Sequence, residues 1–237
     1  MEHIERTVVR GSLVDESCRM TPAYMLRLAQ DISAAHTDVL GIGRETLMEK
    51  GGIFLLAKIR ITVTKTPHIG DRIVVKTRPY EPMRFVYPRF TDICDDDGNV
   101  MARIDSRWVL VDTESFHIMR DVPPYLDGMF PPAGDIGDFR VERRSDYAPA
   151  YELPVRYSMI DRNSHINNCV YATIATDAFG DRLREGRDIK EMIITYHKET
   201  PFGERLSIET AEDGDMLFVR GICGGLPRFE SSMRLGV

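Results

Sequence analysis

A dense set of polar side chains lies between residues 161 and 171, just before a segment with helix-like apolar spacing. The set combines a carboxylate, an imidazole and several carboxamides, from Asp161, Asn163, His165, Asn167 and Asn168. A helix N-terminus needs about one such side chain to accept hydrogen bonds from its unpaired N–H groups. The excess over what capping requires predicts that some of these groups act on a bound molecule.

The elements that must position these side chains occur twice in the chain. At an offset of 133 residues, Ile61–Lys65 falls on Ile194–Lys198 and Gly70–Thr77 falls on Gly203–Thr210. A helix is predicted upstream of each copy, over Pro22–Val39 and Asn167–Leu183, because apolar residues recur there at helical spacing. The repeat indicates two copies of one module.

Strands are predicted after each helix, where β-branched residues alternate with polar ones and turn residues separate the runs. In the first copy they span Ile53–Thr64, Arg72–Arg78, Phe85–Asp95 and Val100–Val111. In the second copy they span Met192–Lys198, Arg205–Ala211, Met216–Cys223 and Arg228–Leu235. A long helix followed by an antiparallel sheet, twice, predicts an α+β fold in which each half is a helix wrapped by a curled sheet.

The two copies are separated by a segment that is poor in regular structure. Residues 122–139 contain four prolines and three glycines, a composition that disfavours helices and strands. We therefore expect an N-terminal module over residues 1–120, a linker over 121–148 and a C-terminal module over 149–237. Two such modules can pair within one chain as a single-module protein pairs in a homodimer, and a homodimer of the whole chain is left open.

Composition narrows the function classes. The formal net charge of −6 argues against general nucleic-acid binding, which requires a basic face. No window approaches the roughly 18 apolar residues of a membrane span, and the first residues lack the order of a signal peptide. The four cysteines stand singly, without the spacing of a zinc site or redox loop, so reduced thiols and a cytoplasmic location are expected.

The motif Asn163-x-His165-Ile166-Asn167-Asn168-x-x-Tyr171, at the head of the second helix of a duplicated chain, resembles the acyl-acyl carrier protein thioesterases of the double hotdog fold. In the first half, Phe54–Lys58 followed by Gly70-Asp71 has the order found in that family. The family often carries Trp and Arg where Phe54 and Lys58 stand. The resemblance implies a tandem hotdog fold that releases free fatty acid from its carrier and so ends acyl chain elongation, with no metal or cofactor.

The segment Tyr196–Thr200 corresponds to a tyrosine, basic residues, a glutamate and commonly a cysteine in that family. Here Thr200 stands at the cysteine position, so a covalent thiol mechanism has no counterpart there. Cys169 is the alternative thiol, but a cysteine within a helix is more often a small buried hydrophobe. An activated water is therefore the predicted nucleophile.

For thioester hydrolysis, Glu199 is the expected general base, provided that partial burial raises its pKa toward neutrality. His165 is expected to hold the attacking water or to protonate the leaving thiolate, since an imidazole works in either protonation state. Glu199 as a solvated strand-end carboxylate and His165 as a capping residue are the competing interpretations.

Asn163 is expected to polarise the thioester carbonyl through its amide. Asp161 would orient His165 or Asn163, as a carboxylate does in a catalytic triad, or would only brace the loop. Backbone N–H groups at the start of the second helix, around Asn167 and Asn168, would add to the stabilisation of the oxyanion.

The acyl chain is placed by the resemblance in the first module, between helix and sheet. The candidate lining residues are Met25, Leu28, Ile32, Phe54, Leu56 and Ile59. Each of them also fits the simpler interpretation of a filled hydrophobic core.

Acyl carrier protein, the implied partner, is acidic, so an acidic enzyme would need a local basic surface to meet it. The candidates are Arg140, Arg143, Arg144 and Arg156 in one group and Arg84 and Arg89 in another. A solvated charge cluster without a partner is the competing interpretation.

Three other functions stay open on the same residues. The chain could hydrolyse coenzyme A thioesters, act as a hydratase on an enoyl thioester, or bind acyl groups without catalysis. The joint presence of Asp161, Asn163, His165 and Glu199 favours hydrolysis over the last of these.

Overall fold

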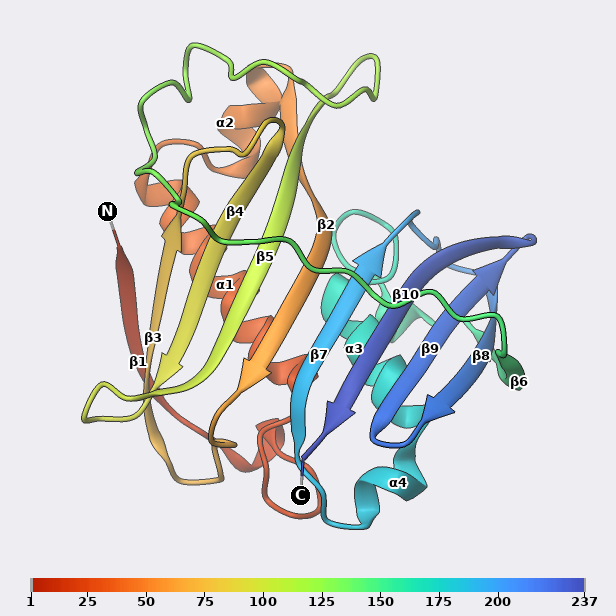
Figure 1. Cartoon of the computed structure of the whole chain (residues 1–237). Helices are drawn as coiled ribbons and strands as arrows, with labels where there is room; N and C mark the ends of the chain where they lie inside the picture. The colour runs from red at the N-terminus through yellow and green to blue at the C-terminus, as the bar shows by residue number, and fades with distance from the viewer. Residues whose placement is uncertain (1, 237) are drawn as a thin grey trace. The chain divides into compact units, whose positions relative to one another are not determined.

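The computed structural model describes residues 2–236 and separates into two units (Figure 1). Unit 1 comprises the chain up to Ile59 together with Thr64–Asp138, and unit 2 comprises Arg60–Val63 together with the chain from Phe139 onward. Each unit combines antiparallel strands with helices, so the α+β class is confirmed. The sequence places the acyl chain in the N-terminal module and the catalytic residues in the C-terminal module, and this division stays a prediction.

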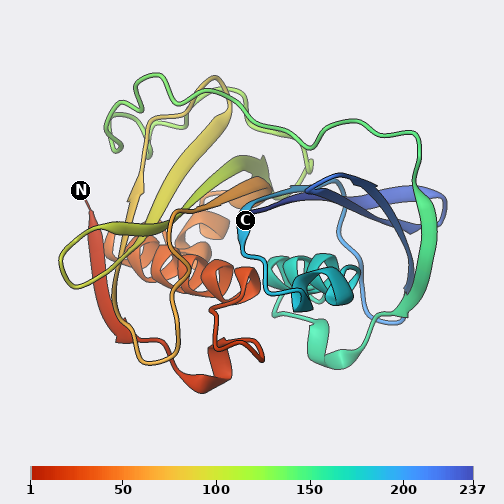
Figure 2. The same cartoon turned by 60° about the horizontal axis from the view of Figure 1, so that its bottom comes forward.

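Unit 1 contains a five-stranded antiparallel sheet with the order β1-β3-β4-β5-β2. Its strands are β1 (His3–Val8), β2 (Gly52–Val63), β3 (Arg72–Pro79), β4 (Val86–Cys94) and β5 (Val100–Asp112). The last four residues of β2, Arg60–Val63, belong to unit 2. Its helices are the 3-10 turn Gly11–Leu13, α1 (Pro22–Val39) and α2 (Arg44–Glu49). Helix α1 lies along one face of the curved sheet (Figure 2) and contacts β3, β1 and β5.

Helix α1 begins and ends where the sequence predicts. Thr21 has an extended backbone and Pro22 occupies the first helical position, which suits a residue without an N–H group. Met25, Ile32 and His36 are buried at helical spacing and face the sheet. Gly41, at φ 70°, lets the chain leave the helix in a left-handed turn.

Unit 2 repeats the arrangement with the strand order β7-β10-β9-β8-β6. Its strands are β6 (Ala148–Pro154), β7 (Ile189–Tyr196), β8 (Arg205–Asp213), β9 (Met216–Cys223) and β10 (Leu226–Leu235). Its helices are the 3-10 turn Tyr157–Met159, α3 (Asn168–Asp177) and α4 (Gly180–Arg184).

The single helix predicted over Asn167–Leu183 is wrong in its length. Helix α3 is capped at Ala178, and Phe179 leaves helical geometry at φ −128° and ψ 29° before α4 starts at Gly180. Glycine inside a helix costs about 1 kcal/mol relative to alanine, which favours a break at this point. Asn167 is the N-cap, and its side chain accepts from the N–H of Cys169 at 2.9 Å.

Strands β1 and β6 and the short helix α2 have no counterpart among the predicted elements. Strands β1 and β6 are the outer strands of their units, and most of their residues are exposed or half-buried. Their sequences therefore lack the alternation that marks a strand with one buried face. The predicted linker over 121–148 ends at Ala148, where β6 begins.

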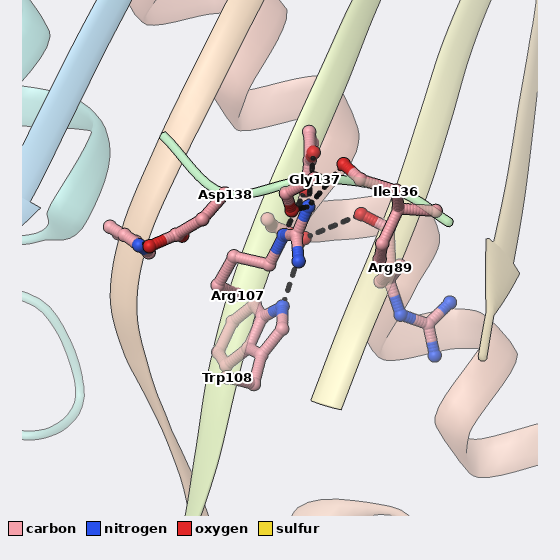
Figure 3. A network of polar contacts seen from close by, with 9 residues as sticks. Arg89, Arg107, Trp108, Ile136, Gly137 and Asp138 are labelled. Carbon is pink, nitrogen blue, oxygen red and sulfur yellow. Dashed lines mark hydrogen bonds and ion pairs between the residues drawn. The ribbon is translucent and has the colours of Figure 1, made fainter. Parts of the chain in front are cut away.

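The proline-rich segment contains no helix or strand between residues 113 and 147 and is tied to the sheet of unit 1 (Figure 3). On β5, Arg107 and Asp105 form a buried ion pair with N···O distances of 2.6 and 2.8 Å. Arg107 also donates to the carbonyl of Gly137 at 3.2 Å, and Lys58 pairs with Asp138. Side chains from β5 and β2 thus hold the irregular proline-rich segment against the sheet.

Candidate active site

The polar segment before α3 forms a closed loop. A bridge joins Ile160 to Ile166, and the N–H of Asp161 donates to the carbonyl of His165 at 3.0 Å. Ser164 adopts a left-handed φ of 67°, which few residues other than glycine adopt. The tight turn at Ser164 fixes the backbone immediately before His165.

The carboxylate of Asp161 is directed at Asn163. Its Oδ1 accepts from the Asn163 N–H at 2.7 Å, and its Oδ2 accepts from the Asn163 side-chain amide at 3.2 Å. The sequence left the choice between His165 and Asn163 open, and the hydrogen bonds are made to Asn163. This contact orients the Asn163 amide.

The segment after β7 pairs with this loop. The N–H of Ile166 donates to the carbonyl of Thr200 at 2.9 Å, and His165 bridges to Pro201 in antiparallel register. Extended by one residue, that register would set Glu199 opposite Asn167, although the N–H of Asn167 donates to the carbonyl of Met159 instead. Ile166 and Thr200 are both buried, at 1% and 0% exposure.

Side chains alternate between the two faces of an antiparallel pairing, which would direct Glu199 and His165 to the face opposite to Ile166 and Thr200. Diagonal neighbours in an antiparallel pair lie roughly 7–8 Å apart, within reach of long side chains. A continued register would therefore direct the imidazole and the carboxylate to one face, although 33 residues separate them along the chain.

Glu199 itself is exposed, whereas the sequence-based mechanism required its partial burial. The expected partial burial of Glu199 is therefore wrong, because Glu199 lies just beyond the end of β7. Within residues 2–236, neither its carboxylate nor the ring of half-buried His165 has a hydrogen-bonding partner. Both groups are available to a ligand.

Arg228, at the start of β10, fixes the backbone of the Glu199 segment. Its guanidinium donates to the carbonyl of Glu199 at 3.1 Å, and its own carbonyl accepts from the N–H of His197 at 2.9 Å. The Arg228 Nε is buried with no partner among the described residues. Sequence analysis missed Arg228 because only the pairing of β10 with β7 brings it here.

Thr200, at the position of the family cysteine, is a buried structural group. Its Oγ1 accepts from the Tyr171 hydroxyl at 3.1 Å. The Tyr196 hydroxyl donates to the carbonyl of Asn168 at 3.1 Å, and burial raises the pKa of both Tyr171 and Tyr196. Cys169 is only 2% exposed, as expected for a small buried hydrophobe.

The prediction that the N–H of Asn167 stabilises the oxyanion is wrong. The N–H of Asn167 donates to the carbonyl of Met159 at 2.9 Å, because Asn167 caps the helix and its backbone closes the preceding turn. The N–H of Asn168, the first residue of α3, has no acceptor among residues 2–236. A developing negative charge at this helix start would meet Asn168 and the Asn163 amide.

Comparison with known families identifies the chain. The N-terminal domain of acyl-ACP thioesterases matches residues 5–127, and the C-terminal domain matches residues 142–220. The chain belongs to the acyl-ACP thioesterase family.

One curated relative of this acyl-ACP thioesterase family member is a plant enzyme. The chain is 24% identical over 186 residues to the chloroplast acyl-[acyl-carrier-protein] hydrolase FATB2 of Cuphea viscosissima, an alignment that covers 73% of this chain and 45% of that protein. It therefore spans about half the length of that curated relative.

Two solved structures share the fold over nearly all of both chains. An acyl-ACP thioesterase from Bacteroides thetaiotaomicron superimposes with a TM-score of 0.89 at 21% identity, covering 99% of this chain and 98% of that one. The 12:0-ACP thioesterase from Umbellularia californica superimposes with a TM-score of 0.88 at 17% identity, covering 99% and 97%.

The candidate acyl-pocket residues of this acyl-ACP thioesterase family member differ in burial. Met25, Ile32 and Ile59 are each 1% exposed, whereas Leu28, Phe54 and Leu56 are half-buried. Phe54 packs edge-on against Tyr87, with ring centroids 5.0 Å apart, beside a buried cluster that includes Leu110 and Phe130. Their assignment as lining stays a prediction.

The predicted basic surfaces need correction. Arg89 is 6% exposed because β4 directs it into unit 1, so it forms no surface patch with exposed Arg84. Arg144 pairs with Asp146 and Asp213, which neutralise its charge. Arg140, Arg143 and Arg156 are exposed.

The helices, the possible metal ligands and the cysteines of the described residues concern three of the sequence predictions. No helix within residues 2–236 is long and apolar enough to cross a membrane. Among the same residues, no three His, Cys, Asp or Glu side chains gather in a way that could hold a metal ion. The four cysteines are free thiols, and Cys18 is the exposed one.

Proposed function

We propose that this chain hydrolyses the thioester that joins a fatty acyl group to acyl carrier protein, releasing free fatty acid. The observation that supports the proposal is the pairing of His165 with Pro201 and of Ile166 with Thr200, because strand alternation in this register would direct His165 and Glu199 to the same face. Membership of the acyl-ACP thioesterase family supports it.

In the proposed mechanism, a water molecule lies between the Glu199 carboxylate and the His165 ring. Glu199 is exposed in the free chain and would become partly buried when the thioester binds over it. It then accepts a proton from this water as the water oxygen attacks the thioester carbonyl carbon. The Asn163 amide and the Asn168 N–H donate to the carbonyl oxygen as it gains negative charge.

Collapse of the tetrahedral intermediate breaks the carbon–sulfur bond. The proton taken from water then reaches the leaving thiolate through His165, so the carrier thiol and the fatty acid are the only products. In this mechanism Asp161 acts only through Asn163, because its carboxylate accepts a 3.2 Å hydrogen bond from the Asn163 side-chain amide.

Each unit is further proposed to be a hotdog module, because a curved antiparallel sheet faces one long helix in unit 1 and the shorter α3 in unit 2. The proposed partner is acyl carrier protein, met by the exposed Arg140, Arg143 and Arg156. A homodimer stays open. A cytoplasmic location remains the sequence-based proposal, supported by four free thiols.

The deciding experiment measures thiol release from one acyl group presented on acyl carrier protein and on coenzyme A. Faster release from the carrier supports the proposal, and faster release from coenzyme A assigns the chain to acyl-CoA hydrolysis instead. Hydration of an enoyl thioester without thiol release would indicate a hydratase. Tight acyl binding with no thiol release from any substrate would indicate a silent binding protein.

A further inference from the structure

Two buried arginines stand on neighbouring strands of unit 1 and differ in their surroundings. The register pairs Pro88 with Arg107 and Arg89 with Ser106, so alternation directs the two guanidinium groups to opposite faces of the sheet (Figure 3). Arg107 is 1% exposed and has a carboxylate partner in Asp105. Arg89 is 6% exposed and lies on the face covered by α1.

Arg89 contacts only neutral acceptors. Its Nη1 donates to Nδ1 of His36 at 3.2 Å and to Oγ1 of Thr77 at 3.2 Å. A guanidinium has five N–H donors, and the three on Nε and Nη2 have no partner within residues 2–236, although these two nitrogens are not as completely buried as His36 Nε2. Burial lowers the pKa of Arg89 to about 10, which still leaves it cationic at neutral pH. A buried charge without a counter-charge is strongly disfavoured.

His36 presents a second unused donor at the same place. Because Arg89 always donates, Nδ1 of His36 must accept, and the neutral ring carries its proton on Nε2. Burial, followed by the charges of Arg89 and His3, lowers the pKa of His36 to about 4. The His36 Nε2 is buried with no partner among the described residues, and the residue is 1% exposed.

The pair lies at one end of the apolar stripe of α1. His36 follows Met25 and Ile32 on the buried face of the helix, and His3 stacks on its ring with centroids 5.5 Å apart. Glu5 is held by His3 at 3.2 Å and makes no ion pair with Arg89. Apolar side chains thus lead to a cation without a counter-charge and to a neutral N–H donor without an acceptor.

We propose that Arg89 and His36 bind a carboxylate at the far end of an acyl chain, which would extend the substrate class to ω-carboxylated acyl groups. This inference rests on the proposed function, because that proposal places the acyl chain in unit 1. A carboxylate supplies both the missing counter-charge and the missing acceptor oxygens. The apolar stripe favours the end of a chain over a small free anion.

A binding experiment tests the pair without using catalysis. Thermal unfolding of the full chain is followed with dodecanedioate, dodecanoate or acetate at equal concentration, and dissociation constants are measured by calorimetry. The dicarboxylate is expected to bind roughly tenfold to a hundredfold more tightly than the monocarboxylate, as charge-assisted hydrogen bonds imply. Arg89→Met should abolish this difference.

The matched control is Arg103→Met, which removes an arginine from β5 at an exposed position paired with Asp92. It should retain the preference for the dicarboxylate. Arg89→Lys keeps the charge and serves if Arg89→Met does not fold, and it should retain only part of the preference. Equal stabilisation by acetate would overturn the assignment to a chain end. No preference in the wild-type chain would overturn the site altogether, with ordered water serving the donors.

A kinetic experiment compares carrier-bound acyl groups of one length that end in methyl or in carboxylate. The ratio of kcat/KM for the carboxylate-ended over the methyl-ended substrate should fall about tenfold or more in Arg89→Met. Wild-type hydrolysis of the methyl-ended substrate with no dicarboxylate binding would defeat this inference alone. Dicarboxylate binding without any thiol release would instead defeat the proposed hydrolysis.

Discussion

The loop before α1 and the loop before α3 have the same backbone. Asp15 donates its N–H to the carbonyl of Arg19 at 2.9 Å, as Asp161 does to His165 at 3.0 Å. Cys18 has a left-handed φ of 61°, matching Ser164 at 67°. Arg19 bridges to His68 in the first loop, as His165 bridges to Pro201 in the second.

The side chains on this shared backbone differ. In the first loop the Asp15 carboxylate accepts from the N–H and the guanidinium of Arg19, so the charged groups neutralise one another. In the second loop Asp161 binds Asn163 instead, and the ring of His165 is left for a ligand. Thr66, buried to 9% exposure, occupies the position that Glu199 holds in unit 2.

The comparison teaches that the scaffold and the chemistry are separable. An aspartate and a left-handed residue suffice to build the loop, and both copies have them. The proposed chemistry depends on Asn163, His165 and Glu199, and unit 1 carries Ser17, Arg19 and Thr66 at the equivalent places. One chain then has two similar loops and one candidate active site.

The largest expected effect comes from replacing Glu199 or His165, because unit 1 has Thr66 and Arg19 at the equivalent positions. Glu199→Gln and His165→Ala should each lower kcat by roughly 10²- to 10⁴-fold, because each removes a proton-transfer group. Thiol release from acyl carrier protein is the measurement, with circular dichroism to verify folding. The matched control, Thr66→Ala at the position equivalent to Glu199, should retain wild-type kcat.

The same assay tests the identity of the nucleophile. Cys169→Ala should keep substantial activity, since that thiol is buried in α3. A folded Cys169→Ala chain without activity would contradict the activated-water mechanism.

The next effect concerns acid stability, which the first helix controls through His36. Its pKa is lowered from 6.5 to about 4 in the folded chain. Between these values the unfolded chain binds a proton that the folded chain does not, so lowering the pH favours unfolding. The free energy of unfolding should fall by about 1–3 kcal/mol from pH 6.5 to pH 4.

Urea unfolding at a series of pH values measures this dependence, and His36→Gln should flatten it. An equally steep acid dependence in His36→Gln would assign the effect to other groups.

A smaller effect separates the two aspartates. Asp161→Asn should lower kcat about tenfold by releasing the Asn163 amide, whereas Asp15→Asn should lower the free energy of unfolding by roughly 1 kcal/mol and leave kcat unchanged. Steady-state kinetics and denaturant unfolding on both variants test this contrast. A loss of kcat in Asp15→Asn would show that the first loop is not a purely structural copy.

The smallest effect concerns the left-handed residues. Ser164→Gly and Cys18→Gly should each stabilise the chain by less than about 1 kcal/mol, because glycine adopts positive φ without steric cost while its unfolded state is more flexible. Thermal unfolding of the two variants should give similar shifts. Opposite shifts would indicate that the two loops are held by different forces.

The amino-acid sequence by itself determined the elements with strong local patterns. The helical spacing of apolar residues was enough to place α1, and turn residues between the β-branched runs were enough to separate the inner strands. The repeat and the family were also readable from it, because both rest on residue type and order. The outer strands β1 and β6 were not, since hydrogen bonds to β3 and β8, rather than a buried face, define them.

Only the tertiary structure decided which polar groups are engaged. It paired Ile166 with Thr200 and set Arg228 behind Glu199. It also turned Arg89 inward, although Arg89 and Arg84 look alike in the sequence. Residue type fixes what a side chain can do, whereas burial and partners depend on strand register and on contacts between residues far apart in the chain.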